Sequence, residues 1–176
     1  MLRTLPLNTE NLYLRKFEEG DIQAAFDNWM SDKNVSEFLT WNTHKNVNET
    51  RRIINSWILY YKNGTMDWCI TLRPDLVPVG SITAVQDFPE KQYCEIGYCI
   101  AERCWNKGYM SEAIKAVVSY IFSSTDYMWI QARYDSENEA SGKCLRKCKF
   151  RKVGEVTGKN KNGKERQYVI MRIDRP

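Results

Sequence analysis

The sequence predicts an α/β (α+β) protein in which helices flank one mixed, mostly antiparallel sheet. Apolar and polar residues alternate over several short segments, as in half-buried strands, whereas elsewhere apolar residues recur at helical spacing. Breaks rich in Pro and Asp separate successive strand-like segments in the middle of the chain, which is typical of antiparallel neighbours. No repeat or linker divides the chain, so we expect a single domain over residues 1–176.

The N-terminal third is predicted to hold one strand and two helices. The polar break Glu18-Glu19-Gly20-Asp21 ends the strand and caps the first helix. The second helix places its large apolar residues on one face, and Asn63-Gly64 stops it. The expected elements are a strand at 12–17, a helix at 22–30, a polar irregular segment at 31–46 and a helix at 47–62.

The remainder of the chain alternates between strands and helices. Tyr93 to Ile100 alternates as a half-buried strand and leads through a glycine-bearing turn into a helix, in which Ala113, Val117 and Ile121 share one side. The expected strands are 67–72, 79–85, 93–100, 127–134, 150–157 and 167–173, and the expected helices are 110–122 and 138–148.

Composition describes an ordinary water-soluble chain. Its residues are 43% hydrophobic and 27% charged, and the formal net charge of +4 favours an anionic ligand without requiring nucleic acid. No apolar run approaches a membrane span and no signal-peptide segment opens the chain, so we expect a cytoplasmic protein that does not enter the membrane. The six cysteines form no C-x-x-C motif and only one histidine is present, so we expect free thiols and no metal.

The turn before the central helix is a candidate anion site. The first amides of a helix have no partner within the helix, and the helix dipole adds positive potential there. Arg103 and Lys107 lie beside this turn in the sequence, and Gly108 precedes the helix. A phosphate-bearing ligand is therefore expected, although a glycine that only permits a tight turn is the simpler alternative.

At these residues the chain resembles the GCN5-related N-acetyltransferases (GNAT), and within them the RimJ/RimL-like branch. The stretch Trp105 to Ala113, W-N-K-G-Y-M-S-E-A, resembles the branch pattern W-G-x-G-Y-x-x-E-A, and L-x-L-R-x-[FY]-x-x-x-D near the N-terminus is a second match. The resemblance implies the GNAT fold with acetyl-CoA as cosubstrate. It implies cofactor contacts from Ile100, Ala101, Arg103, Trp105, Asn106, Lys107, Gly108, Tyr109, Met110, Ser111, Asn138 and Ser141.

Two residues are candidates for catalysis. Glu95 lies on the strand that faces the acetyl group in the family, where a carboxylate often takes the amine proton, commonly through water; a solvated or substrate-binding carboxylate is the alternative. Many relatives place a tyrosine proton donor where this chain has Leu145. Ser141 is therefore the expected donor to the departing thiolate, directly or through water, with an ordinary helix surface residue as the alternative and Tyr134 a more distant choice. Asn138 is also a plausible helix N-cap.

The acceptor side is predicted from the aromatic residues of the N-terminal region. Trp29, Trp41 and Tyr98 are candidate substrate-binding residues, with ordinary core packing as the alternative for the tryptophans. The acceptor is left open between an amine-bearing small molecule and a protein N-terminus, including that of a ribosomal protein, and the branch suggests a homodimer. Two other functions are considered: a CoA-binding protein without turnover, and an RNA- or ribosome-binding module using the basic stretch 143–166.

Overall fold

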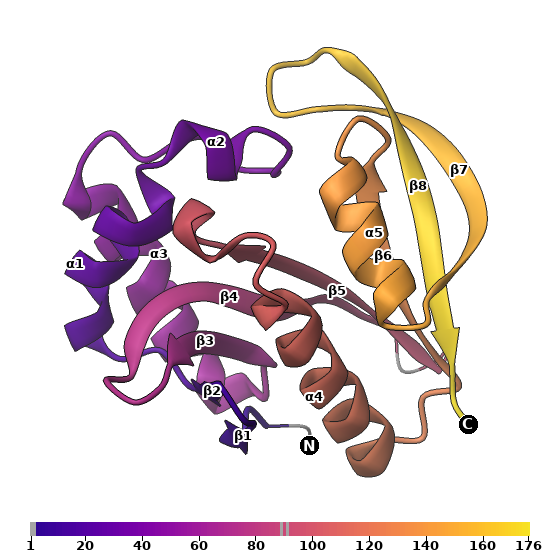
Figure 1. Ribbon diagram of the computed structural model, residues 1–176, viewed down its shortest axis with the longest axis horizontal. Coiled ribbons are helices and arrows are strands. Elements are labelled where there is room, and N and C mark those ends of the chain that lie inside the picture. Colours follow the sequence, from indigo (N-terminus) through magenta and orange to yellow (C-terminus); the bar gives the residue numbers. More distant parts are fainter. Residues whose placement is uncertain (1–2, 89, 91) are drawn as a thin grey trace.

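The computed structural model of the protein describes residues 3–88, 90 and 92–176. These residues form an eight-stranded sheet in the order β1-β2-β3-β4-β5-β6-β8-β7 (Figure 1). Every neighbouring pair is antiparallel except β5 and β6. The strands are β1 (Leu7–Asn8), β2 (Leu12–Arg15), β3 (Asp67–Leu72), β4 (Val77–Phe88), β5 (Tyr93–Ile100), β6 (Trp129–Asp135), β7 (Arg151–Lys159) and β8 (Glu165–Asp174).

Helices pack against the sheet in two groups. The first group, α1 (Ile22–Ala25) and α3 (Val47–Tyr60), packs together, and α1 contacts β4. The second group, α4 (Tyr109–Ser124) and α5 (Glu139–Lys147), lies side by side, and α4 also contacts β1 and β2 (Figure 1). None of the helices in the described part of the chain is long and apolar enough to cross a bilayer.

The expected class is confirmed; in the C-terminal half an unpredicted 3-10 turn at Glu102–Cys104 and shifts of one to two residues in element bounds are the differences, and the N-terminal half differs more. The first helix continues from α1 as a π-helical turn, Phe26–Met30, and the segment expected to be irregular contains the short helix α2 (Lys33–Ser36). The two-residue strand β1 was not predicted, because two residues cannot display an alternating pattern. Gly64 ends the helical region after α3 with φ +83°, as its sequence position indicated.

The central helix α4 owes its position to one apolar face. Ala113, Ile114, Val117 and Ile121 are fully buried and recur at three- and four-residue intervals, so they form a continuous stripe toward the core. Burying a large aliphatic side chain stabilises a protein by about 1.5–3 kcal/mol. Because this stripe fixes α4 against the sheet, it also fixes the N-terminus of the helix, which lies beside the end of β5.

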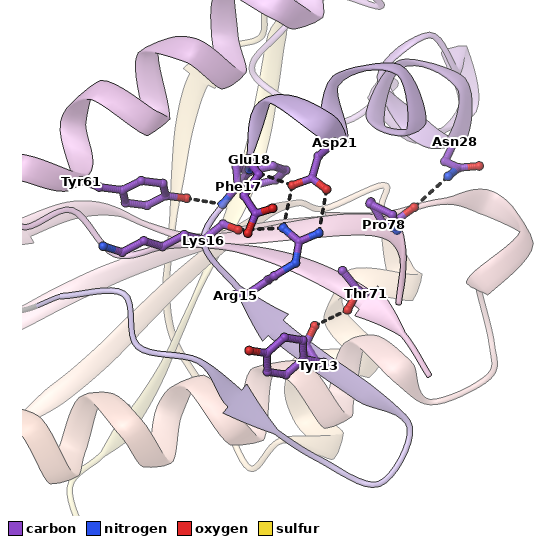
Figure 2. A network of polar contacts seen from close by, with 10 residues as sticks. All are labelled: Tyr13, Arg15, Lys16, Phe17, Glu18, Asp21, Asn28, Tyr61, Thr71 and Pro78. Carbon is purple, nitrogen blue, oxygen red and sulfur yellow. Dashed lines mark hydrogen bonds and ion pairs between the residues drawn. The ribbon is translucent and has the colours of Figure 1, made fainter. Parts of the chain in front are cut away.

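A buried ion pair joins the end of β2 to the first helical turn (Figure 2). Arg15 donates from Nη1 and Nη2 to the two carboxylate oxygens of Asp21, both at 2.7 Å, and Asp21 also accepts the amide of Glu18 at 2.8 Å. Asp21 is 4% exposed. Hydrogen bonding to Asp21 raises the pKa of Arg15 against the opposing effect of burial. This ion pair therefore ties the end of β2 to the turn that leads into α1.

We predict that Asp21→Ala lowers the free energy of unfolding by about 2–3 kcal/mol, because it removes a bidentate ion pair and leaves a partly buried guanidinium without its anion. Urea denaturation followed by tryptophan fluorescence measures the change. Glu19→Ala, which removes an exposed carboxylate from the same turn, is the matched control and should change stability by less than about 0.5 kcal/mol. Equal effects of the two substitutions would contradict the role of the ion pair.

Candidate active site

The site is organised by a gap in the sheet between β5 and β6. The two parallel strands pair only from Tyr93 to Ile96 on β5 and from Trp129 to Ala132 on β6. Beyond these residues β5 continues to pair with β4, whereas in the described part of the chain no residue of β6 pairs with β5 from Gly97 onward. A cavity of about 1400 Å³ is centred on this region.

The cavity passes from one face of the sheet to the other. Successive side chains of a strand point to opposite faces, yet both sets from β5 line the cavity. Ile96, Tyr98 and Ile100 face α5, as the Tyr98 contact described below shows, whereas Glu95, Gly97 and Cys99 face the other way. Leu39, Trp41 and Trp57 complete the lining from the N-terminal segments. A long ligand can therefore enter on the α4–α5 side and present its end on the side of Glu95.

The glycine turn has the geometry of a backbone anion site. Gly108 is the N-cap of the 16-residue helix α4 and has φ +86°, and Asn106 also has a positive φ of +58°. Asparagine adopts this region more readily than most residues, so the turn tolerates it in place of glycine. A Cβ atom built on Gly108 would lie 3.8 Å from Nζ of Lys147, which brings a cation from α5 to the turn. These features fit the pyrophosphate of a coenzyme A molecule.

Eight of the twelve residues expected to contact the cofactor line the cavity, and four do not. The side chains of Arg103 and Lys107 are exposed and lie outside it, and Tyr109 is half-buried on the first turn of α4. Lys147 was not predicted, because nothing in the spacing of the sequence brings the C-terminal end of α5 to the start of α4. The eight lining residues are Ile100, Trp105, Asn106, Gly108, Met110, Ser111, Asn138 and Ser141.

The expectation for the main chain around Ala101 is wrong. The amide of Ala101 donates to the carbonyl of Val79 at 2.7 Å, and Ala101 is fully buried outside the cavity. The carbonyl of Ile100 accepts a hydrogen bond from Nε1 of Trp105 at 2.9 Å. Trp105 therefore supports the strand end rather than offering its indole N–H to a ligand. Main-chain groups that can face a ligand lie further up β5, between Gly97 and Cys99.

Glu95 is held by two side chains on the face of the sheet toward which Gly97 and Cys99 also point, called the acceptor face below. It is 5% exposed, and its carboxylate accepts from Nε2 of Gln131 at 2.7 Å and from Nε of Arg133 at 2.8 Å. Both partners lie on β6, and Gln131 is directly opposite Glu95 in the parallel register. The carboxylate is thus an oriented anion in the wall of the cavity. Neither partner was predicted, because the pairing of β5 with β6 is not encoded in local sequence.

Ser141 and Tyr98 form a hydroxyl pair across the gap. Their oxygens are 2.8 Å apart, which joins β5 to the first turn of α5. Burial raises the pKa of Tyr98 well above its ordinary value, so the phenol stays protonated at neutral pH. Asn138 caps α5 by accepting the amide of Ser141 at 3.1 Å. Leu145 is fully buried in the core and offers no proton donor.

The predicted substrate-side residues separate into two groups. Trp41 and Tyr98 line the cavity, whereas Trp29 is fully buried in the hydrophobic core and does not reach it, so the assignment of Trp29 to substrate binding is wrong. Its place on the π-helical turn directs the indole inward. Trp41 is held from the β7–β8 hairpin: Lys161 Nζ donates to its carbonyl at 3.1 Å and also to the carbonyl of Ser36.

The six cysteines are free thiols, and those near the acceptor face are poor nucleophiles. Burial raises the pKa of Cys99 and of Cys104, so both remain protonated at neutral pH. Cys144 differs: hydrogen bonding from Cys148, then from Ser111, together with the charge of Lys147, lowers its pKa to about 7. It packs against Ser111 of α4, with 3.3 Å between Sγ and Oγ, which places it on the α4–α5 side, away from Glu95.

Comparison with known proteins identifies this arrangement. A family model described as an acetyltransferase (GNAT) domain matches residues 11–151. The chain belongs to the GNAT family of acetyltransferases. It is 30% identical over 149 residues to the uncharacterized N-acetyltransferase YoaA of Bacillus subtilis (strain 168), and the match covers 84% of each protein. The expected family and enzyme class, an acetyl-CoA-dependent N-acetyltransferase, are therefore confirmed.

Solved structures share the GNAT fold. An acetyltransferase (GNAT family) from Bacillus anthracis superposes with a TM-score of 0.85 at 24% identity, over 97% of this chain and 98% of that one. RimL, the ribosomal L7/L12 alpha-N-protein acetyltransferase, was solved in complex with coenzyme A and superposes with a TM-score of 0.86 at 19% identity, over 97% of this chain and 98% of that one. At these identities the likeness establishes the fold.

We predict that Gly80→Ala destabilises the GNAT domain by at least about 2 kcal/mol and weakens coenzyme A binding, because overpacking forces the backbone to shift. A Cβ atom at Gly80 would lie 2.4 Å from the carbonyl oxygen of Cys99 and 2.9 Å from Cα of Ile100, so β5 itself must move. Urea denaturation and calorimetric titration with coenzyme A measure both effects. Gly20→Ala, where no atom lies within 4 Å, is the control; unchanged behaviour of Gly80→Ala would contradict the close approach.

Proposed function

We propose that this enzyme transfers the acetyl group of acetyl-CoA directly to a primary amine, without an acyl-enzyme. The observation that supports this most strongly is the cavity itself, which joins the glycine turn on the α4–α5 side to the oriented carboxylate of Glu95 on the other side. A donor bound along it would present its thioester where the acceptor enters. Orientation of the two reactants in one cavity supplies much of the rate acceleration of such transfers.

The cofactor half is formed by α4, α5 and the free edge of β5. The amides that follow Gly108 and the ammonium of Lys147 bind the pyrophosphate, since both offer positive potential to phosphate oxygens. The main chain between Gly97 and Cys99 binds the amide-bearing arm as an added strand would. Asn138 helps by holding the start of α5, and thus Ser141, beside the gap.

The chemical roles are divided between the two faces. The amine attacks the thioester carbonyl as a neutral group, and Glu95 accepts its proton, directly or through water, from a position fixed by Gln131 and Arg133. On the other face, Ser141, held by its hydrogen bond with Tyr98, donates a proton to the departing thiolate and regains one from solvent water, while Glu95 releases the proton of the amine to solvent. The raised pKa of Cys99 argues against an acetyl-cysteine intermediate on the acceptor face.

The charges of the basic stretch 143–166 favour an enzyme over an RNA-binding module. Several of its cations have partners within the chain: Arg151 pairs with Asp174, Lys152 with Glu155, and Arg166 with Asp135 and Glu137. Lys and Arg side chains that already pair with carboxylates of the same chain contribute little to a phosphate-binding surface. Among structural neighbours, RimL acetylates the N-terminus of a ribosomal protein, which supports a primary amine as acceptor here.

We predict that Gly108→Glu weakens coenzyme A binding at least about tenfold, because it adds an anion beside the phosphates and forces a side chain into a positive φ. Gly163→Glu is the matched control: it introduces the same side chain at φ +76° in the β7–β8 turn, with no atom within 4 Å of the new Cβ. Calorimetric titration with coenzyme A compares the two. If both variants bind as wild type does, the glycine turn is not the phosphate site.

We predict that Glu95→Gln lowers kcat for acetyl transfer at least about tenfold, because the neutral amide cannot accept the amine proton.

Ser141→Ala should lower kcat by a similar factor while leaving coenzyme A affinity within about threefold, since it removes a proton donor rather than a phosphate contact. Thiol release from acetyl-CoA, measured across a panel of peptides and small amines, gives both values. Binding of acetyl-CoA without release on any amine would instead favour a binding protein that lacks turnover.

A further inference from the structure

Among the residues that the structure describes, Arg133 is the cation that pairs with Glu95, and only part of its guanidinium takes part. Nε donates to Glu95, and 41% of the side chain remains exposed. Within the described residues, no hydrogen bond involves Nη1 or Nη2. Arg133 also lines the cavity. Its outer edge, formed by the two Nη groups, is therefore available to a ligand in the same space that the acceptor amine must enter.

Other arginines of this chain that are comparably tied to the fold use their outer edges. Arg15 donates from both Nη groups to Asp21, and Arg175 donates from both to the carbonyls of Phe122 and Thr125. Through these contacts, those two arginines hold separate segments of the chain together. Arg133 instead is anchored at its inner nitrogen and keeps free the planar pair of donors that matches a carboxylate in bidentate fashion.

We propose that the acceptor is a small zwitterionic amine whose carboxylate binds the Nη edge of Arg133 while its amine lies at Glu95. This inference rests on the proposed function and narrows its substrate class. Glu95 and Arg133 present a negative and a positive group side by side, 2.8 Å apart at their nearest atoms. A molecule that carries an amine and a carboxylate a few bonds apart can place its amine at Glu95 and its carboxylate at Arg133, so each of its charges meets the opposite charge. An amine without an anion leaves the outer edge of Arg133 unpaired and is repelled by it.

The remaining walls suggest the probe. Leu39, Trp41 and Trp57 form an apolar, largely aromatic surface of the same cavity, so an α-amino acid with an aromatic side chain can use both features. L-phenylalanine is therefore compared with L-phenylalaninamide, which has the same side chain and amine but no carboxylate, and with the amidated peptide Phe-Ala-Ala. The amine of phenylalaninamide is less basic than that of phenylalanine, so a larger fraction of it is neutral at neutral pH. That difference alone would favour phenylalaninamide as the acceptor, so it opposes the preference for phenylalanine that we expect.

The experiment measures kcat/KM for the three acceptors by thiol release from acetyl-CoA. In wild type the value for phenylalanine should exceed that for phenylalaninamide and for the peptide at least about tenfold, chiefly through KM. Arg133→Gln should reduce this acid-to-amide ratio to about one. A variant that merely disturbs Glu95 lowers both values and leaves their ratio unchanged, so the ratio separates carboxylate binding from a structural role of Arg133. Lys159→Gln, which removes another cation from the cavity lining, is the control and should retain the wild-type ratio.

Failure of this inference is distinct from failure of the proposed function. Equal or better transfer to the amide or the peptide by wild type would overturn the zwitterionic acceptor while supporting amine acetylation. An unchanged ratio in Arg133→Gln would overturn the role of Arg133. Absence of transfer to all three acceptors, together with turnover on amines that lack a carboxylate, would overturn the inference alone; absence of turnover on every amine would overturn both.

Discussion

The active site depends on the early end of one parallel strand pairing. Main-chain groups buried inside a protein need hydrogen-bond partners, and β5 finds them on both sides only as far as Ile96. From Gly97 onward one edge of the strand opens into the cavity, so the sheet itself presents a line of donors and acceptors to a ligand. The chain then enters α4 within ten residues of Ile100, and the stripe that buries α4 fixes its N-terminus at the same opening. The proposed binding of a peptide-like arm and a phosphate group therefore relies on backbone geometry, with few demands on side-chain identity.

Side chains from distant parts of the chain complete the site by bridging this opening. Asn138 and the Ser141–Tyr98 hydroxyl pair tie α5 to β5 on the cofactor face. On the acceptor face, Lys161 reaches from the β7–β8 hairpin to the carbonyls of Ser36 and Trp41 and so holds the segment that carries Trp41. The acceptor wall is therefore assembled from both ends of the chain, and a single ammonium joins them through two carbonyls.

The features that could be predicted from the sequence are those that depend on residues close together in the chain. Helices and strands were recognisable because their periodicity is local, and the glycine turn was recognisable because φ +86° at Gly108 requires that residue type. Pairings across the sheet left no such pattern: the contact of Glu95 with Gln131 and Arg133, and the approach of Lys147 to Gly108, depend on register and packing. Trp29 was misassigned for a related reason, since the π-helical turn that directs it into the core has no sequence pattern that we could recognise. Ala101 was misassigned because its amide is already bound to Val79.

The Glu95–Arg133 pair explains how one small surface can serve both selection and chemistry. If the buried Glu95–Arg133 pair only stabilised the fold, it would offer little advantage, because apolar residues of similar volume often stabilise a protein as much. Here Gln131 and Nε of Arg133 fix the orientation of the carboxylate, which a proton acceptor requires, while the other end of the guanidinium remains in the cavity. In the proposed function, selection of the acceptor uses an interaction formed on binding, and proton removal uses one formed as the amine attacks. The two contributions act on different steps, so the first changes mainly KM and the second mainly kcat.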